Sequence, residues 1–248
     1  MAEQRTLKLF RGTRERGELK EYQVAAGEGM VVLDAVHAIQ AEQAPDLAVR
    51  WNCKAGKCGS CSAEINGKPK LLCMTRMSDY APGETITVTP MRAFPVIKDL
   101  VTDVSWNYEV NKRIPAFQPR KPDAPDGTWR MYQYEIERPQ EFRKCIECFL
   151  CQDVCHVIRD HPENAEHFAG PRMFIRYAEL EMHPLDTNDR SLLLQEKMGL
   201  GYCNITKCCT EVCPESITIT DNAIIPLKER VVDANYDPLA ALWRKLTK

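Results

Sequence analysis

The chain lacks the hydrophobic segments that membrane insertion and secretion require. No stretch of its 248 residues approaches the roughly 18 consecutive apolar residues of a membrane-spanning helix. The N-terminal segment MAEQRTLKLFRGTRERGE has no apolar signal core, and its acidic residues Glu3, Glu15 and Glu18 are not typical of a mitochondrial presequence. We therefore expect a protein of a reducing, cytosolic compartment with no transmembrane span of its own.

The chain also lacks a strong charge imbalance and the usual catalytic motifs. Its net charge is −2, with 44% hydrophobic and 27% charged residues, which is typical of a globular protein and does not suggest nucleic acid as a partner. No nucleotide-binding glycine loop, Ser/His/Asp set or carboxylate pair is visible. We therefore expect no substrate-converting residues on this chain.

What the chain does have is twelve cysteines, which a reducing compartment would not use for disulfides. In the N-terminal half, Cys53-x4-Cys58-x2-Cys61 followed by Cys73 has the plant-type ferredoxin spacing for a [2Fe–2S] cluster. Gly56 and Gly59 lie between these ligands, where the absence of Cβ atoms lets backbone N–H groups approach sulfur. The sequence therefore predicts a [2Fe–2S] site here.

Two further runs lie in the second half, Cys145-x2-Cys148-x2-Cys151-x3-Cys155 and Cys203 to Cys213-Pro214. The first has the bacterial-type ferredoxin spacing, in which three cysteines bind one cluster and the fourth binds the other. Aligned with it, the second run has Thr206 where a cysteine is expected, and a hydroxyl is a poor iron ligand. We therefore predict [3Fe–4S] on Cys155, Cys203 and Cys209, and [4Fe–4S] on Cys145, Cys148, Cys151 and Cys213.

Cys208 falls outside this alignment, and we interpret it as a small buried side chain. The alternative to iron is zinc, which would make the chain an interaction module without redox activity. Structural zinc sites use four ligands in paired CxxC spacing. The x4–x2 spacing and the Thr206 gap both favour iron–sulfur clusters.

The pattern of hydrophobic residues divides the chain into two domains, 1–105 and 106–248. Strands are predicted at 6–11, 21–25, 62–66, 70–74 and 85–91, with a helix at 30–41 and an Asn66–Gly67 hairpin turn. Helical periodicity covers 94–114, and a proline-rich loop covers 115–127. Helices are predicted at 141–159, 170–182 and 188–199.

Three clusters without a catalytic motif indicate an electron carrier that connects a two-electron donor, typically a flavin, to another acceptor. The segments RWNCKAGKCGSC (50–61), CIECFLCQDVC (145–155), AGP (169–171) and CCTEVCP (208–214) carry a resemblance that covers nearly the whole chain. The chain resembles the iron–sulfur subunit of succinate dehydrogenase and fumarate reductase.

That resemblance implies an α+β fold, with an N-terminal β-grasp [2Fe–2S] domain and a C-terminal α-helical ferredoxin-like domain. It implies an FAD-containing flavoprotein partner and membrane-anchor subunits with haem b, at the cytoplasmic face of the bacterial inner membrane. Electrons would pass from succinate through FAD and the three clusters to quinone, as in the tricarboxylic acid cycle and respiratory chain. The alternatives are the reverse flow of a quinol:fumarate reductase and a thiol-dependent fumarate reductase.

The chain departs from the family beside the predicted [3Fe–4S] centre. His156 replaces the usual proline, Asn204 stands where histidine is common, and Val157–Ile158–Arg159–Asp160 replaces a tryptophan pair found in many ubiquinone-using members. The resemblance places quinone near His156, Asn204 and Thr206. Because these residues differ from those of ubiquinone-using members, we expect menaquinone, with His156 able to bond or protonate a quinone oxygen.

Overall fold

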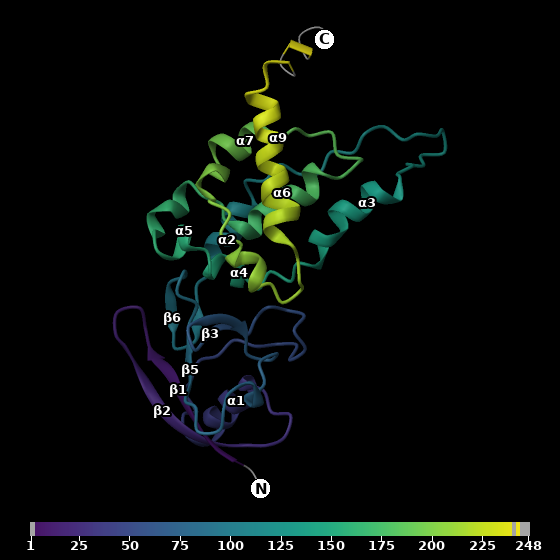
Figure 1. The fold of residues 1–248 in the computed structure, drawn as a ribbon. Coiled ribbons are helices and arrows are strands. Elements are labelled where there is room, and N and C mark those ends of the chain that lie inside the picture. The colour runs from purple at the N-terminus through teal and green to yellow at the C-terminus, as the bar shows by residue number, and fades with distance from the viewer. Residues whose placement is uncertain (1–2, 240–241, 244–248) are drawn as a thin grey trace. The chain divides into compact units, whose positions relative to one another are not determined.

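The computed structural model describes residues 3–239 and 242–243 (Figure 1). The outermost residues of both predicted domains, 1–2 and 240–248 apart from 242–243, lie outside the described residues. The chain forms two compact units. The first comprises Met1–Ser105, Ile146–Val154 and Val212–Pro214, and the second comprises Trp106–Cys145, Cys155–Glu211 and Glu215–Lys248. Two short cysteine-containing segments from the second half of the chain thus belong to the first unit.

The first unit is built on a five-stranded mixed sheet with strand order β2-β1-β5-β3-β4. Strand β1 pairs antiparallel with β2 and parallel with β5, while β3 pairs antiparallel with both β5 and β4. This sheet and its single long helix confirm the α+β fold predicted for this half. The elements are β1 (Glu3–Gly12), β2 (Gly17–Ala26), α1 (Val32–Glu42), β3 (Ser62–Ile65), β4 (Lys68–Leu71) and β5 (Ile86–Thr89).

The core of this unit follows from two patterns of hydrophobic residues, the alternation in strand β1 and the helical repeat in α1. Alternate residues of β1 point inward, and Leu7 and Leu9 are fully buried. Helix α1 turns one apolar face toward β2 and buries Val32, Leu33, Ala35, Val36 and Ile39. The sheet and the helix therefore share one hydrophobic layer.

The predicted hairpin is confirmed, although its second strand is shorter and earlier than expected. Asn66 and Gly67 have φ angles of 48° and 74°, as a two-residue turn requires. Strand β4 ends at Leu71. Leu72 then donates its N–H to the Cys61 carbonyl and accepts from Leu33 N–H, so the chain turns back toward the cysteine loop.

The helix predicted over 94–114 is wrong in its first half. Residues 96–102 form the short strands β6 (Val96–Lys98) and β7 (Val101–Thr102), and helix α2 covers only Ser105–Asn111. The turn between the strands contains Asp99 at a φ of 48°. Its buried carboxylate accepts hydrogen bonds from Gly12 N–H and Ala48 N–H, both at 2.8 Å, and from Arg11 Nε at 3.1 Å. These tertiary bonds favour the turn over the helix.

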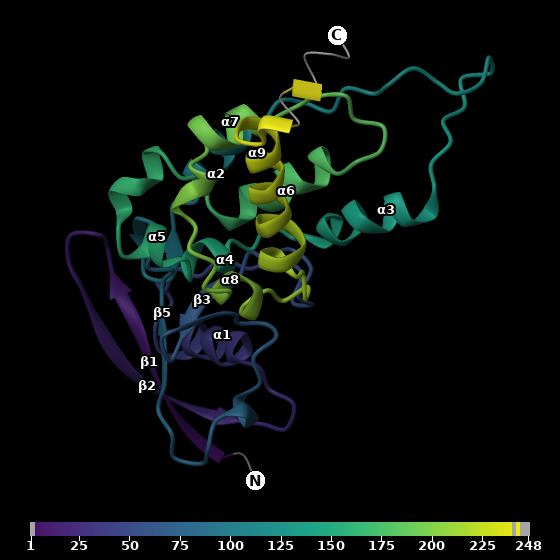
Figure 2. The same cartoon turned by 45° about the horizontal axis from the view of Figure 1, so that its top comes forward.

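The second unit is helical, as predicted (Figure 1). Helix α9 packs against α7, and a π-helical turn at Ile219–Ile224 packs against α6 and α9 (Figure 2). Helices α3 and α9 were not anticipated. The helices are α3 (Gln133–Gln140), α5 (His156–Arg159), α6 (Pro171–Glu181), α7 (Ser191–Glu196), α8 (Cys208–Glu211) and α9 (Ile225–Asn235).

The single helix predicted over 141–159 is also wrong. The chain forms a 3-10 turn at Glu141–Lys144, an extended cysteine loop, and the short helices α4 (Leu150–Asp153) and α5. Glu147 and Phe149 adopt left-handed φ angles of 55° and 60°, which no continuous right-handed helix contains. The loop therefore takes the place of helix where the cysteines are closely spaced.

The proline-rich stretch 115–127 forms the predicted extended loop, which reaches outward between α2 and α3 in both views (Figure 2). Its first residues are attached to the helices through Arg190. This fully buried guanidinium donates to the carbonyls of Pro115 and Ala116 at 3.2 and 3.0 Å, and to Asp186 at 2.8 Å. A β-bridge between Pro119 and Asp186 continues the attachment.

Candidate metal centres

The first cysteine loop directs backbone N–H groups at its own sulfurs. Cys53 Sγ accepts hydrogen bonds from Ala55 N–H at 3.4 Å and Lys57 N–H at 3.3 Å, and Cys58 Sγ accepts from Cys53 N–H at 3.5 Å. The sequence predicted such bonds from the glycines of the loop. They stabilise negative charge on sulfur, as cluster thiolates require.

The two glycines of this loop are required by both conformation and space. Gly56 and Gly59 have φ angles of 66° and 67°, a region that side chains rarely adopt. A Cβ on Gly56 would lie 2.9 Å from Met74 Sδ, and one on Gly59 would lie 2.6 Å from Cys148 Cα. The loop can therefore follow this path only without side chains at these positions.

The four thiols of the first site differ in their surroundings. Cys53 is exposed and Cys58 half-buried, whereas Cys61 and Cys73 are buried. Although burial opposes ionisation of Cys58, hydrogen bonds from Ser60 and from the Cys53 backbone lower its pKa to about 6. Burial raises the pKa of Cys61 to about 12. Cys61 thus requires a strong competing charge, such as iron, to become a thiolate.

The two cysteine runs of the second half repeat one backbone pattern. Each has two left-handed residues at the same positions relative to its first cysteine, which is uncommon outside glycine. The pattern aligns Thr206 with Cys148 and Cys209 with Cys151. The φ angles are 55° at Glu147, 60° at Phe149, 63° at Ile205 and 62° at Lys207.

Cys155, Cys203 and Cys209 line one small cavity of the second unit, together with His156, Thr206 and Cys208. Burial raises the pKa of Cys155 to about 12, and neighbouring Cys208 and Cys209 thiolates add to the shift. Burial also raises the pKa of Cys209, whose Sγ lies 3.5 Å from Thr220 Oγ1. Thr220 thus contacts a predicted ligand, although no sequence motif marks it.

The quinone-associated residues of the sequence prediction lie around this cavity. His156 begins α5 and is half-buried in the cavity wall. Thr206 also lines the wall and is exposed, while Asn204 is exposed on the same loop.

The predicted [4Fe–4S] ligands divide between the two units. Cys148 and Cys151 are buried and Cys213 is half-buried, all in segments of the first unit. Cys145 is half-buried and ends a segment of the second unit, one residue before Ile146.

Ser62 joins the first cysteine loop to Cys148 within the first unit. Its buried hydroxyl is 2.8 Å from the Gly59 carbonyl and 2.9 Å from the Cys148 carbonyl, so both oxygens share one donor. Sequence reasoning missed Ser62, because a serine after a cysteine carries no signal for a contact 86 residues away.

Within residues 3–239 and 242–243, no three histidine, cysteine, aspartate or glutamate side chains converge to hold one metal ion. None of the described helices is long and apolar enough to cross a bilayer.

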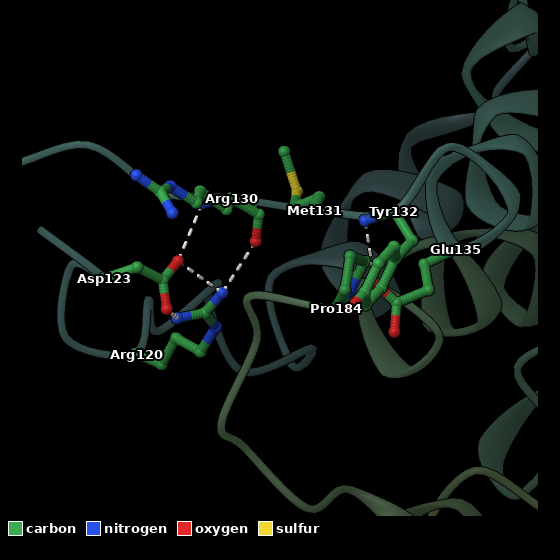
Figure 3. A pocket seen from close by; sticks show the side chains of 7 residues that line it. All are labelled: Arg120, Asp123, Arg130, Met131, Tyr132, Glu135 and Pro184. Atoms are coloured by element: carbon green, nitrogen blue, oxygen red, sulfur yellow. Dashed lines mark hydrogen bonds and ion pairs between the residues drawn. The ribbon is translucent and has the colours of Figure 1, made fainter.

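A cavity of about 520 Å³ lies elsewhere in the second unit, between the extended loop and Pro184 (Figure 3). Arg120 and Asp123 pair in its wall, which lowers the pKa of Asp123 to about 2. Its lining has no cysteine.

The donor sets fit iron–sulfur clusters. Soft thiolates are the ligands that such clusters use, and they bind different irons, so they need not converge on one point. In the first loop, N–H groups face sulfur and two glycines leave room for a close backbone. In the second unit, the three predicted ligand thiols share a cavity with Cys208, and Thr206 stands at the position that aligns with a fourth ligand.

Comparison with known families agrees with this arrangement. Residues 6–109 match a family model described as a 2Fe-2S iron-sulfur cluster binding domain, and residues 141–217 match a 4Fe-4S dicluster domain. The predicted succession of a [2Fe–2S] domain and a two-cluster helical domain is thereby confirmed.

Named relatives identify the family. The fumarate reductase iron-sulfur subunit of Mycobacterium tuberculosis is 34% identical over 204 residues, which cover 79% of each chain. One chain of the fumarate reductase (CoM/CoB) of Methanothermobacter marburgensis is 32% identical over 98% of this chain, but this chain spans only 47% of that relative.

A solved structure gives a closer match. A chain of the Mycobacterium smegmatis Sdh1 complex in the apo form is 64% identical, with a TM-score of 0.92, over 96% of this chain and 99% of that chain. The fold, the two cluster domains and these relatives together show that the chain belongs to the iron–sulfur subunits of the succinate dehydrogenase/fumarate reductase family.

Proposed function

We propose that this subunit passes single electrons through [2Fe–2S], [4Fe–4S] and [3Fe–4S] clusters between the FAD of a flavoprotein subunit and membrane quinone. Its physiological role is succinate oxidation, in the tricarboxylic acid cycle and respiratory chain. The ligands are Cys53, Cys58, Cys61 and Cys73 for the first cluster; Cys145, Cys148, Cys151 and Cys213 for the second; and Cys155, Cys203 and Cys209 for the third.

One observation carries the assignment of three different clusters. The left-handed residues of the two cysteine runs in the second half align Thr206 with Cys148, so one run has a hydroxyl where the other has a thiol. Iron prefers thiolate to a neutral hydroxyl in such clusters. This supports a cluster without its fourth iron at the Cys155, Cys203 and Cys209 site.

Replacing Thr206 by cysteine tests this assignment. The T206C protein should lose the electron paramagnetic resonance signal of an oxidised [3Fe–4S] cluster and contain one more iron per chain. A three-iron signal of unchanged intensity would contradict the alignment of the two runs.

The first cluster loop is the surface that we assign to the flavoprotein. Cys53 is exposed there; Trp51, two residues before it, is 46% exposed, and Met74, which lies beside Gly56 of the loop, is 58% exposed. Lys54 Nζ lies 4.9 Å from the Trp51 ring centroid. Large exposed apolar side chains beside an exposed ligand are typical of a protein interface.

At the other end of the electron path, we propose that the second unit associates with a membrane-anchor subunit carrying haem b at the cytoplasmic face of the bacterial inner membrane. Quinone, expected to be menaquinone, would approach the cavity wall at His156 and the exposed Asn204 and Thr206. Replacing His156 by alanine in the assembled complex should slow quinone reduction and weaken inhibitor binding. If both were unchanged, His156 would be a packing residue.

The direction of electron flow is tested on the assembled complex, because a cluster chain conducts both ways. Faster succinate oxidation by quinone than fumarate reduction by quinol would support the succinate dehydrogenase assignment. The reverse order would favour the quinol:fumarate reductase alternative, and fumarate reduction by thiols alone would favour a thiol-dependent reductase. A colourless protein with zinc and no acid-labile sulfide would leave the zinc-binding interaction module.

A further inference from the structure

Cys208 lies on the same cavity as the three thiols assigned to the [3Fe–4S] cluster. The cavity wall includes Cys155, Cys203, Cys208 and Cys209, so four thiols surround it rather than three. Cys208 begins helix α8, directly before Cys209, and is half-buried. Because its position breaks the ferredoxin spacing, the sequence favoured a small buried side chain over a ligand.

Cys208 contacts Thr206, the residue at the position of the absent fourth ligand. Thr206 occupies the place of Cys148 in the repeated backbone pattern, which is the place of the absent fourth ligand. The Cys208 sulfur lies 3.3 Å from the Thr206 hydroxyl oxygen. The Cys208 thiol is therefore within hydrogen-bonding distance of the Thr206 hydroxyl, which occupies the position of the fourth ligand.

The position of the fourth ligand is also the most solvent-exposed part of the site. Cys155 and Cys209 are 7% and 6% exposed, whereas Thr206 is exposed and Cys208 is half-buried. A metal ion from solution can therefore reach Cys208 without passing the buried thiols.

The segment that carries Thr206 and Cys208 contains two strained backbone positions. Ile205 and Lys207, on either side of Thr206, have left-handed φ angles, which are unfavourable for a β-branched side chain such as isoleucine. The Lys207 ammonium group is bound on the outside by Asp221 at 2.8 Å. Relaxation of this backbone would bring the Cys208 sulfur to the position of the Thr206 hydroxyl.

We propose that Cys208 is a conditional fourth ligand, which binds an additional iron and converts the [3Fe–4S] site to [4Fe–4S]. One electron, supplied by the electron chain of the subunit, first reduces [3Fe–4S]⁺ to [3Fe–4S]⁰. The Cys208 thiol then loses its proton to water and binds Fe²⁺, giving [4Fe–4S]²⁺. A one-electron oxidant such as ferricyanide removes one electron from [4Fe–4S]²⁺; Fe²⁺ then leaves, the Cys208 thiolate takes up a proton from water, and [3Fe–4S]⁺ is restored. Cluster type is one determinant of reduction potential. The iron supply would therefore alter the reduction potential of the third cluster, the last in the subunit.

This inference rests on the proposed [3Fe–4S] assignment, and the experiment examines that assignment first. The oxidised holoprotein is examined by electron paramagnetic resonance, reduced anaerobically with dithionite, and incubated with ⁵⁷Fe²⁺. Mössbauer spectroscopy then shows whether the label has entered a four-iron cluster. The wild-type protein should gain one labelled iron per chain in a four-iron cluster, and it should recover its three-iron signal only after a one-electron oxidant is added and the labelled iron is released.

Two variants separate the thiol from the hydroxyl. Replacing Cys208 by alanine should abolish the uptake of labelled iron while leaving the starting three-iron signal intact. Replacing Thr206 by valine removes the neighbouring hydroxyl but keeps the thiol, and it should leave iron uptake intact. The [2Fe–2S] signal of each protein serves as the internal control for cluster content.

The outcomes distinguish failure of the inference from failure of the assignment. A three-iron signal that does not respond to iron, or equal uptake in the Cys208→Ala protein, would overturn the role of Cys208 alone. If the wild-type protein showed no three-iron signal at the start, the [3Fe–4S] assignment would fail. Cys208 would still be supported if its replacement by alanine then produced that signal, and overturned if it did not.

Discussion

Gly59 of the first cysteine loop lies directly against the backbone of Cys148, a predicted ligand of the second cluster. A Cβ atom at Gly59 would be 2.6 Å from Cys148 Cα and 2.8 Å from its nitrogen. The Ser62 hydroxyl lies between the carbonyls of the same two residues, at 2.8 and 2.9 Å. This contact joins the two segments to which we assign the first two clusters, and under that assignment it would provide a short route for electrons between them.

Replacing Gly59 by alanine should disrupt this route. The added methyl group would push Cys148 away and would also occupy an unfavourable left-handed conformation, at a combined cost of about 2–5 kcal/mol. We expect partial loss of the [4Fe–4S] cluster and slow reduction of the remainder by the [2Fe–2S] centre. Iron content and rapid-freeze electron paramagnetic resonance measure both.

Gly83→Ala is the matched control for that variant. Gly83 has a φ of 77°, but a Cβ there meets nothing within 4 Å. It should therefore show the conformational cost without loss of cluster. If the two variants behaved alike, the contact with Cys148 would have no special importance.

Ser62→Ala is a milder change at the same junction. It removes a hydrogen bond to the Cys148 carbonyl, worth about 1 kcal/mol, without adding atoms. We expect all clusters to remain and the potential of the second cluster to shift, because hydrogen bonding around ligands tunes it. A redox titration that gave wild-type potentials for both clusters would contradict this.

Asp99→Asn should destabilise the first unit. The carboxylate is 1% exposed and accepts from two backbone N–H groups and from Arg11. An amide cannot accept at both positions, so we expect a loss of about 3–5 kcal/mol in unfolding free energy. Asp46→Asn removes the exposed partner of the same Arg11 and should cost much less, because solvent screens that pair. Equal costs in urea unfolding would contradict the importance of burial.

Arg190 should be the main attachment of the extended loop at 115–127. Methionine would leave the buried carboxylates Asp186 and Glu181 unpaired, at a cost of about 3–5 kcal/mol. Lysine keeps the charge but loses the several directed N–H donors, so it should cost less. Arg176→Met, which breaks a half-buried pair with Glu179, is the control and should cost less, because Glu179 keeps Arg143 as a second partner.

Limited proteolysis gives a second readout for Arg190. Cleavage within the loop should be faster in both Arg190 variants than in the wild-type or Arg176→Met protein. Unchanged cleavage with reduced stability would show that Arg190 supports only the helices.

His37 should make the first unit less stable in mild acid. Burial, followed by the charge of Lys54, lowers its pKa below 6.5, and its Nε2 is buried without a hydrogen-bond partner. The unfolded chain therefore takes up this proton at higher pH than the folded chain does. The resulting stability is complete above about pH 6.5 and is lost as the pH falls toward the lowered folded pKa.

His37→Phe removes this titration and keeps an aromatic ring beside Trp51, whose ring centroid is 4.8 Å from that of His37. Between pH 7.5 and 5.5, the melting temperature of the wild-type protein should fall more than that of the variant. Parallel pH curves would show that His37 does not contribute.

The sequence predicted best those elements that depend on a local pattern of hydrophobic residues or of turn residues. The strand with Leu7 and Leu9, the helix with Val36 and Ile39, and the Asn66–Gly67 turn all follow from local pattern. The family was also recognisable, because cysteine spacing is fixed by cluster chemistry rather than by neighbouring elements.

The sequence misled where long-range contacts decide the backbone. The helix predicted through Asp99 is replaced by a turn, because distant N–H groups bind that buried carboxylate. The helix predicted through Glu147 and Phe149 gives way to a loop whose left-handed residues have no sequence signature. Ser62 and Cys208 could not be selected, since their importance depends on what the fold places beside them.

The central claim, that this subunit carries three different clusters in series, is tested most directly by electron paramagnetic resonance during a redox titration of the anaerobically purified protein, with iron and sulfide counted. We predict a near-isotropic [3Fe–4S] signal in the oxidised protein, then [2Fe–2S] and [4Fe–4S] signals on reduction. The count should be nine irons per chain, the sum expected for these three cluster types. A protein that is silent in both states and loaded with zinc would contradict the account.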